Sequence, residues 1–237
     1  MKIKLLLISC IILLKVNGWA QKTSGISFAV ERMCLIPWNT ETGLPYMQGP
    51  GRNLGAASFE MIDDFTIAVL TNATNEIYLF NSISGKFVSK FSIHFQGKDF
   101  AYGYNTFYIL GEYQIGVFDK TAKLKRMIEF DKKHIAVVRM AVLGSSVYIL
   151  TPDGNSYLVE SNGQKPAKEE FHKGWVTSNG NFVFSSIVND FTYNVEFSNR
   201  KNNIVIKTFP SMEKIAGVFP IGENGNKLFL DVQTYVS

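Results

Sequence analysis

Short apolar segments recur along the chain in one register. They are Ile67-Ala68-Val69-Leu70, Phe107-Tyr108-Ile109-Leu110 and Val147-Tyr148-Ile149-Leu150, and weaker copies follow at 182–185 and 228–231. Runs of β-branched and aromatic residues that end at turn formers are typical of buried strands. A regular spacing of about 40 residues between such segments indicates a repeat architecture.

Each repeat predicts four short strands, because turn residues interrupt the apolar pattern every 8–12 positions and no window keeps the apolar spacing of a helix. Four antiparallel strands per repeat are the signature of β-propeller blades, and the alternative is a β-sandwich with coincidental spacing. The predicted strands are 58–62, 66–70, 76–80 and 86–93; 100–104, 106–110, 114–118 and 124–130; 139–143, 146–150, 156–160 and a polar outer strand within 163–170; 175–178, 182–188, 192–198 and 203–209; and 215–219 and 227–236.

The predicted fold is therefore all-β, a β-propeller of four-stranded antiparallel blades, either five closed blades or an incomplete six. Residues 215–236 supply only two strands of the last blade, and 26–36 would complete it in the five-bladed form. Without these strands, the unfinished blade would leave an open edge of unpaired backbone N–H and C=O groups. Residues 57–237 form the predicted propeller, and 21–56 form an N-terminal strand followed by a long irregular segment rich in proline and glycine, a kind of loop that often carries function.

The first 20 residues have the layout of a secretory signal peptide. Lys2 and Lys4 precede an apolar run from Leu5 to Leu14, and Gly18-Trp19-Ala20 supplies small residues for cleavage after Ala20. The run is too short for a membrane span, which needs about 20 residues. A lipobox ending at Cys10 is a weaker alternative, because the apolar residues continue past it. The prediction is an exported protein, periplasmic or extracellular.

Cleavage changes the charge and cysteine arguments. The signal peptide contains three lysines and no acidic residue, so the mature chain keeps 21 basic and 20 acidic residues. This balance gives no reason to expect nucleic acid as a partner. The mature chain also keeps a single cysteine, Cys34, which cannot form an internal disulfide, so a hydrophobic core must stabilise the fold.

Several segments resemble the NHL-type repeat of bacterial six-bladed propellers. The resemblance rests on Gly49-Pro50-Gly51, Ala57–Met61, Ile77–Asn81, Gly85–Val88 and Ile115–Asp119, in which a strand of the form I-x-x-F-[DN] precedes a Gly-Lys turn. Later repeats depart from it: Tyr157-Leu158-Val159-Glu160 lacks the phenylalanine. The resemblance covers roughly residues 49–231 and implies a propeller among exported bacterial proteins, lyases and binding scaffolds. Its motifs are degenerate, so they indicate fold better than function.

Three histidines are candidate metal ligands: His94, His134 and His172, which follow one another at nearly the spacing of the apolar segments. Each stands just before the first strand of a predicted blade, so equivalent loops would carry them. A few relatives of the NHL propellers hold a metal through histidines of successive blades, and imidazole suits Zn or Fe. The alternative is three solvent-facing positions inherited by duplication, since no acidic residue flanks them consistently.

Other candidates have simpler explanations. The glycine-rich segment 49–55 lacks the Lys-Ser/Thr and the helix of a nucleotide site, so it reads as a turn. Asp63-Asp64 reads as a turn between strands. The aromatic residues Trp38, Trp175, Tyr102 and Tyr104 would either pack between blades or line a channel mouth.

The sequence predicts no catalytic constellation and no resident cofactor beyond the Zn or Fe of the histidine hypothesis. We expect a non-enzymatic binding module for a protein, peptide or glycan, with its site on the loops before each first strand, including 95–98 and 132–136. Two hypotheses stay open beside it. One is a metal-dependent lyase or hydrolase that uses the three histidines, and the other is a truncated gene product without independent function.

Overall fold

The structure is a computed structural model that describes residues 36–38, 43–49, 52–131, 137–167, 170–177, 179–197, 204–207, 214–224 and 227–235. These residues form strands and turns, with no helix among them. The chain divides into two compact units, one comprising 32–172 and the other 1–31 with 173–237. In the part of the chain that is described, no helix is long and apolar enough to cross a membrane. The predicted signal peptide, Cys10, Cys34 and most of segment 26–36 lie outside the described residues.

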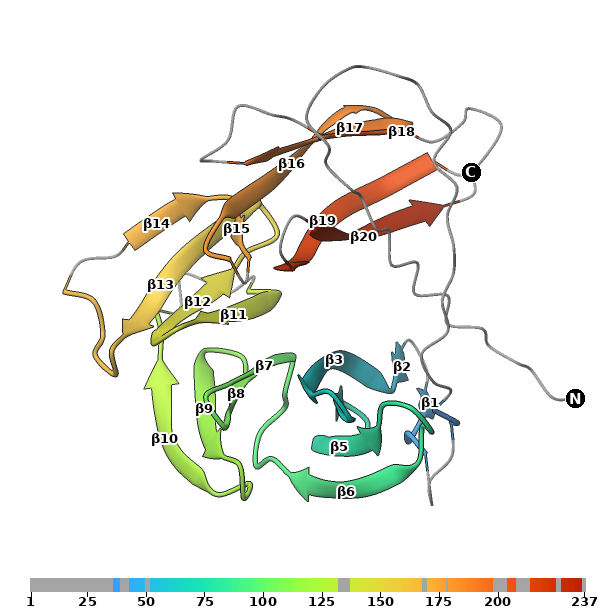
Figure 1. Cartoon of the computed structure of the whole chain (residues 1–237), viewed down its shortest axis with the longest axis vertical. Helices are drawn as coiled ribbons and strands as arrows, with labels where there is room; N and C mark the ends of the chain where they lie inside the picture. The colour runs from blue at the N-terminus through green and yellow to red at the C-terminus, as the bar shows by residue number, and fades with distance from the viewer. Residues whose placement is uncertain are drawn as a thin grey trace, which may run out of the picture. The chain divides into compact units, whose positions relative to one another are not determined.

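Unit 32–172 contains three successive four-stranded antiparallel sheets, which we call blades 1, 2 and 3 (Figure 1). In each blade the strands pair in chain order. Blade 1 is β3 (Ala56–Asp63), β4 (Thr66–Thr71), β5 (Glu76–Asn81) and β6 (Phe87–Ser92); blade 2 is β7 (Asp99–Gly103), β8 (Thr106–Leu110), β9 (Gln114–Asp119) and β10 (Leu124–Glu129); blade 3 is β11 (Arg139–Leu143), β12 (Ser146–Leu150), β13 (Asn155–Ser161) and β14 (Glu170–Lys173). Each repeat of the sequence thus corresponds to one blade.

The recurring I-x-x-F-[DN] segment is the third strand of a blade, and each of its fixed residues has a physical role. Ile77 and Phe80 in β5 are fully buried. Asn81 ends the strand, and its Oδ1 accepts hydrogen bonds from the backbone N–H groups of Ile83 at 3.1 Å and Ser84 at 2.8 Å. Such Asx turns favour asparagine and aspartate at this position. The motif therefore encodes a buried strand followed by a tight turn.

Blade 3 replaces the buried phenylalanine of this motif with Glu160. Glu160 pairs with Val147 as Phe118 pairs with Phe107 in blade 2, so the two residues are equivalent. The Glu160 side chain is 6% exposed, and both of its oxygens accept from the guanidinium of Arg126 on β10. A buried carboxylate needs such a partner. The departure from the motif is therefore compensated by an ion pair between blades 2 and 3.

One predicted strand was misplaced. The polar stretch 163–170 was expected to form the outer strand of blade 3, but β14 begins only at Glu170. The rings of Phe171 and Tyr157 contact each other at 5.4 Å between centroids, and the His172 ring meets the edge of Tyr148 at 6.3 Å. The strand forms where side chains can cover the neighbouring strands, and the charged stretch before it has no such side chains.

The blades of this unit pack face to face through apolar side chains. One core cluster joins Leu70 and Ile77 of blade 1 with Phe107 and Phe118 of blade 2. A second cluster joins blade 2 and blade 3 through Leu110, Ile115, Val147, Ile149 and Met140. Consecutive blades thus share their cores, as repeat architectures require.

The other unit contains one four-stranded sheet, formed by β15 (Trp175–Val176), β16 (Phe182–Asn189), β17 (Thr192–Phe197) and β18 (Ile204–Lys207), and a long hairpin of β19 (Lys214–Asn224) and β20 (Lys227–Tyr235). A core of Val183, Val195, Val218, Leu228 and Leu230 joins them. The Ser185 hydroxyl donates a hydrogen bond to the Val218 carbonyl oxygen at 2.6 Å, which also ties the hairpin to the sheet.

Candidate functional site

The three blades of unit 32–172 present two ends with different loops. The first end, which we call the loop face, comprises the segment before β3, the β4–β5 turn and the β6–β7 connection. Asn72 ties two of these together, because its N–H donates to the Gly55 oxygen at 2.9 Å and its Oδ1 accepts from the Gly55 N–H at 2.8 Å. The Ile93 N–H donates to the Asn75 oxygen at 2.9 Å, which ties the β6–β7 connection to the β4–β5 turn. This is the end on which a binding site was predicted.

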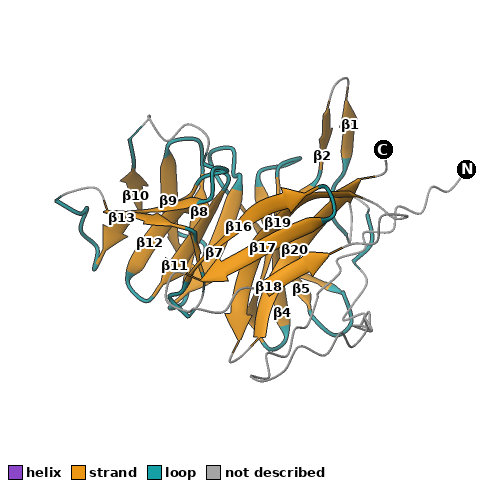
Figure 2. Cartoon of the chain, turned by 90° about the horizontal axis from the view of Figure 1, so that it is seen from above, coloured by secondary structure: helices purple, strands orange, loops and turns teal. Residues whose placement is uncertain are grey.

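The loop face carries an element that the sequence did not predict. Segment 37–56 was expected to be irregular, but β1 (Met47–Gly49) and β2 (Arg52–Leu54) within it pair as an antiparallel hairpin. This hairpin, which we call the arm, belongs to none of the four-stranded sheets. Figure 2 shows it projecting beyond the neighbouring loops of the blades. Strands this short leave no period-2 pattern in the sequence.

The base of the arm is fixed to blade 1. Leu44 is buried with Val69 and Phe80, and its N–H donates to the Pro37 oxygen at 2.9 Å. Trp38 lies edge-on to Tyr46, with 5.7 Å between ring centroids. A Cβ on Gly55 would come within 3.2 Å of the Trp38 ring, so glycine permits this close approach. The position of the arm is therefore set by packing at its base.

Apolar side chains remain exposed at the base and the start of the arm. Tyr46 is 46% exposed and Met47 is 53% exposed. An isolated two-stranded hairpin is at best marginally stable in water and gains stability by covering an apolar surface. The arm therefore has the features of a contact element.

The opposite end, which we call the turn face, is formed by the β3–β4, β5–β6 and β7–β8 turns. The Ser82 N–H donates to the Phe65 oxygen at 2.8 Å, which joins the two turns of blade 1. Inter-blade bonds from Ser58 to Asp99 and from Tyr102 to Glu60 connect residues 41 and 42 positions apart, so β3 and β7 run in the same direction. The turns that follow these two strands consequently lie at the same end.

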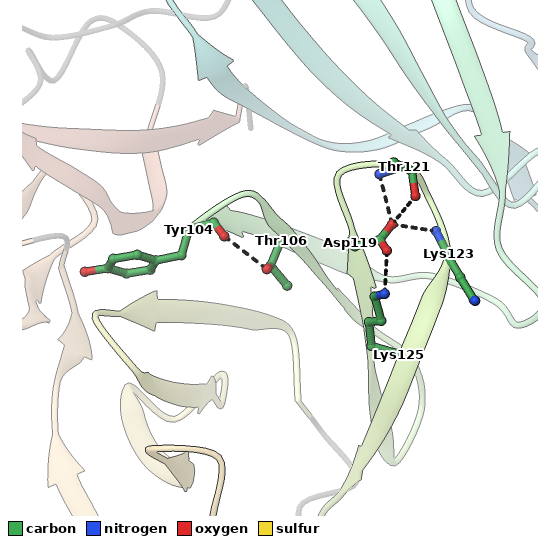
Figure 3. A network of polar contacts seen from close by, with 6 residues as sticks. All are labelled: Tyr104, Thr106, Asp119, Thr121, Lys123 and Lys125. Carbon is green, nitrogen blue, oxygen red and sulfur yellow. Dashed lines mark hydrogen bonds and ion pairs between the residues drawn. The ribbon is translucent and has the colours of Figure 1, made fainter.

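The turn face carries three strongly exposed apolar side chains, one on each turn. Phe65 is 61%, Ile83 is 69% and Tyr104 is 79% exposed. Figure 3 shows the Tyr104 ring pointing away from the polar network of the β9–β10 turn. Among the large apolar side chains described in this unit, only Phe59 is also more than 60% exposed. These three exposed apolar side chains therefore lie at the same end of blades 1 and 2.

The β9–β10 turn is closed by Asp119, whose carboxylate accepts from the Thr121 hydroxyl at 2.6 Å, the Lys123 N–H at 3.0 Å and the Lys125 ammonium at 2.8 Å (Figure 3). The Lys125 and Thr121 side chains hold the pKa of Asp119 well below its usual range. Because its carboxylate is saturated by the turn itself, we assign Asp119 a structural role.

Two carboxyl groups lie between the inner strands of the blades. Asp99 accepts from the Ser58 hydroxyl at 2.5 Å and from the Met140 N–H at 2.9 Å, and so joins all three blades. Glu60 accepts from the Tyr102 N–H at 2.6 Å. Burial raises the pKa of Glu60 to about 7; the Tyr102 bond opposes the rise and the nearby Asp99 charge adds to it. Burial also raises the pKa of Asp99, against the bonds from Ser58 and Met140.

The predicted metal ligands are only partly described. His94 is exposed in the β6–β7 connection, whereas His172 lies within β14 and not in a loop, with its Nε2 at 2.9 Å from Oε1 of Glu170. His134 lies outside the described residues. Among the residues that are described, no group of three histidine, cysteine, aspartate or glutamate side chains could hold a metal ion. The three-histidine site therefore stays a prediction.

The aromatic candidates divide between packing and exposure. Tyr102 packs against Phe107 at 4.7 Å between ring centroids, and Trp175 stacks on Phe219 at 5.3 Å, so these two rings stabilise the fold. Trp38 and Tyr104 are the two that reach the surface.

The carboxyls of Asp99 and Glu60 were not singled out in the sequence, because their partners lie about one repeat away along the chain.

Comparison with solved structures identifies the fold. The chain is similar to Kuenenia stuttgartiensis hydrazine synthase, at 13% identity and a TM-score of 0.50 over 73% of this chain and 55% of that chain. It is also similar to the Pan2 WD40 domain of Neurospora crassa (14%, TM-score 0.44, 63% and 49%) and to BamB of Moraxella catarrhalis (11%, TM-score 0.38, 76% and 59%). The chain thus spans about half the length of these three proteins.

The predicted fold class is confirmed: the chain is an all-β propeller of four-stranded antiparallel blades, and the two-stranded sheet at its end fits an incomplete propeller. At such low identity the likeness concerns the fold alone. No protein-family model and no curated protein sequence matches the chain.

Proposed function

We propose that the protein is an exported, non-enzymatic binding module whose loop face contacts a protein, peptide or glycan partner. The observation that carries the proposal is the arm and its base: Met47 on β1 is exposed, and Tyr46, which packs on Trp38 at the base, keeps nearly half of its surface exposed. Rigid aromatic side chains lose little conformational entropy on binding and are enriched among the residues that dominate interface energies. Export rests on the signal-peptide pattern of residues 1–20, and the NHL-like motifs agree with an exported propeller.

The test compares binding by residues 21–237 with binding by two variants of the same chain. The arm variant is Tyr46→Ser with Met47→Ser. The control is Val88→Ser, which removes an apolar side chain that is 58% exposed on β6. Peptide and glycan arrays, followed by titration of the hits, should show at least about a tenfold loss of affinity for the arm variant, the size expected for losing a central apolar contact. Equal affinity of the arm variant and the wild type for every hit would refute the proposal.

A metal-dependent lyase or hydrolase is the second candidate, and one contact favours it. The Glu170 carboxylate next to Nε2 of His172 is the kind of partner that orients metal-bound histidines and raises their basicity. If His94 and His134 joined it, three imidazoles would leave a Zn or Fe position open to a substrate. Elemental analysis of residues 21–237 tests this candidate directly.

A further inference from the structure

The side chains on the turn face are held in place by their own turns. The Asp63 carboxylate accepts the Phe65 N–H at 2.8 Å, and the Ser82 hydroxyl donates to the Asp64 oxygen at 3.0 Å. Asn81 closes the turn that carries Ile83. The apolar side chains therefore project from hydrogen-bonded turns that need no reorganisation before a partner binds, which lowers the entropic cost of association.

Tyr104 has a positive φ, a left-handed backbone conformation that tyrosine rarely adopts. Tyr104 and Asn105 have φ values of 53° and 58°, as in the type I′ turns for which Asn-Gly is preferred. A non-glycine residue in this region costs on the order of 1 kcal/mol. The ring is also largely exposed, so packing within the protein offsets little of this conformational cost. The exposed ring is therefore available for contact with a partner.

The β3–β4 turn that carries Phe65 is negatively charged. The antiparallel order of blade 2 places the β9–β10 turn, with the exposed Lys120 and Lys123, at the same end, so the negative charge is local to blade 1. Asp63 and Asp64 are both exposed, and no ion pair joins either carboxylate to a cation within the described residues. Lys86, on the β5–β6 turn, is the single basic residue in the two turns of blade 1. The apolar patch of Phe65 and Ile83 thus has two carboxylates at its edge.

We propose that the turn face is a second docking surface, which binds a segment of a partner protein in which lysine or arginine alternates with bulky apolar side chains. The apolar side chains of such a segment would cover Phe65, Ile83 and Tyr104, while its cations would meet Asp63 and Asp64. Complementary charge at the rim of an apolar contact directs which partner binds and speeds association. With the arm at the other end, the propeller would bridge two partners.

The probe is a fluorescein-labelled peptide of alternating lysine and leucine, titrated into residues 21–237 at low ionic strength and followed by fluorescence anisotropy. Asp63→Asn with Asp64→Asn keeps the oxygen that accepts the Phe65 N–H but removes both charges, and should weaken binding about fivefold. The matched control, Glu112→Gln with Glu129→Gln, changes the net charge equally at exposed positions away from the turn face and should leave the affinity unchanged. Equal effects of the two double variants would overturn the proposal, because attraction would then be general.

Tyr104→Asn separates binding from folding. Asparagine suits the turn, so this variant should melt at a higher temperature than the wild type while binding the peptide at least about threefold more weakly. Unchanged affinity, or equal affinity for a peptide with glutamate in place of lysine, would overturn the proposal. Sedimentation supplies the remaining outcome: self-association that Phe65→Ser abolishes would show that a second copy covers this face instead. The arm variant should bind the peptide with the affinity of the wild type, so this experiment tests the turn-face proposal separately from the loop-face proposal.

Discussion

Replacing Glu60 with glutamine tests the energetic role of the inner-strand carboxyls. The ordinary pKa of a glutamate is 4.5, and burial between blades 1 and 2 raises the pKa of Glu60 to about 7. Each pH unit of difference between the folded and unfolded pKa corresponds to about 1.4 kcal/mol, so the ionised carboxylate should cost the fold about 3 kcal/mol.

The sign follows from proton binding. Below pH 4.5 the carboxyl is protonated in both states, and its neutral form makes its full contribution to the native state. Between pH 4.5 and about 7 the unfolded chain releases the proton while the native state keeps it, so the free energy of unfolding falls as pH rises. Above pH 7 the loss is complete.

Urea unfolding of wild type and Glu60→Gln from pH 4 to pH 8 measures this difference. Glutamine cannot ionise, but its oxygen can still accept the Tyr102 N–H. The variant should therefore match the wild type near pH 4 and exceed its free energy of unfolding by about 3 kcal/mol at pH 8. A stability difference that stays constant across this range would refute the reasoning.

Three further perturbations test other parts of the structure. Arg126→Ala leaves the buried Glu160 carboxylate unpaired and should destabilise the unit by about 3 kcal/mol in urea unfolding, whereas the double substitution Arg126→Met with Glu160→Met should recover most of that loss. Gly174→Ala should cost about 2 kcal/mol or more in thermal unfolding, because φ is +101° and the new Cβ would lie 2.9 Å from the Val183 nitrogen; Gly163→Ala, with φ +75° and open space, should cost about half as much. If the metal hypothesis holds, elemental analysis should find one Zn or Fe per chain, lost when alanine replaces His94, His134 and His172, and its absence from well-folded protein would remove that hypothesis.

The sequence predicted the blades well because the residues of each strand and of the turn after it identify that strand without tertiary information. Buried residues such as Ile77 and Phe80 recur in the third strand, and Asn81 marks its end, so strand and turn could be located without tertiary information. β14 and the arm could not be located in this way. Their strands are very short, and they form because neighbouring elements cover them, as Leu44 anchors the base of the arm.

The sequence pointed to one end of the blades as the place of a binding site, and that site stays a prediction. The loops before the first strands were expected to carry it, and the arm stands at that end of the blades, but the apolar turn face was not anticipated. Phe65 looks like an ordinary turn residue in the sequence. Tyr104 was considered only for packing between blades or for a channel mouth, and the fold reveals that both side chains remain exposed at one end. The buried carboxyls escaped notice for a related reason, since a glutamate such as Glu60 gives no local sign that its partner lies 42 residues away.

Asp99 gives the repeats a fixed order. It stands in the middle blade and reaches Ser58, 41 residues before it, and Met140, 41 residues after it. Blade 1 therefore supplies a hydroxyl donor, blade 2 a carboxylate and blade 3 a backbone donor, three different groups that fit together only in this order. A rearrangement that moved blade 2 to the start of the array would bury a carboxylate with one of its neighbours missing. The three blades are therefore not interchangeable at this contact, because each supplies a different group to it.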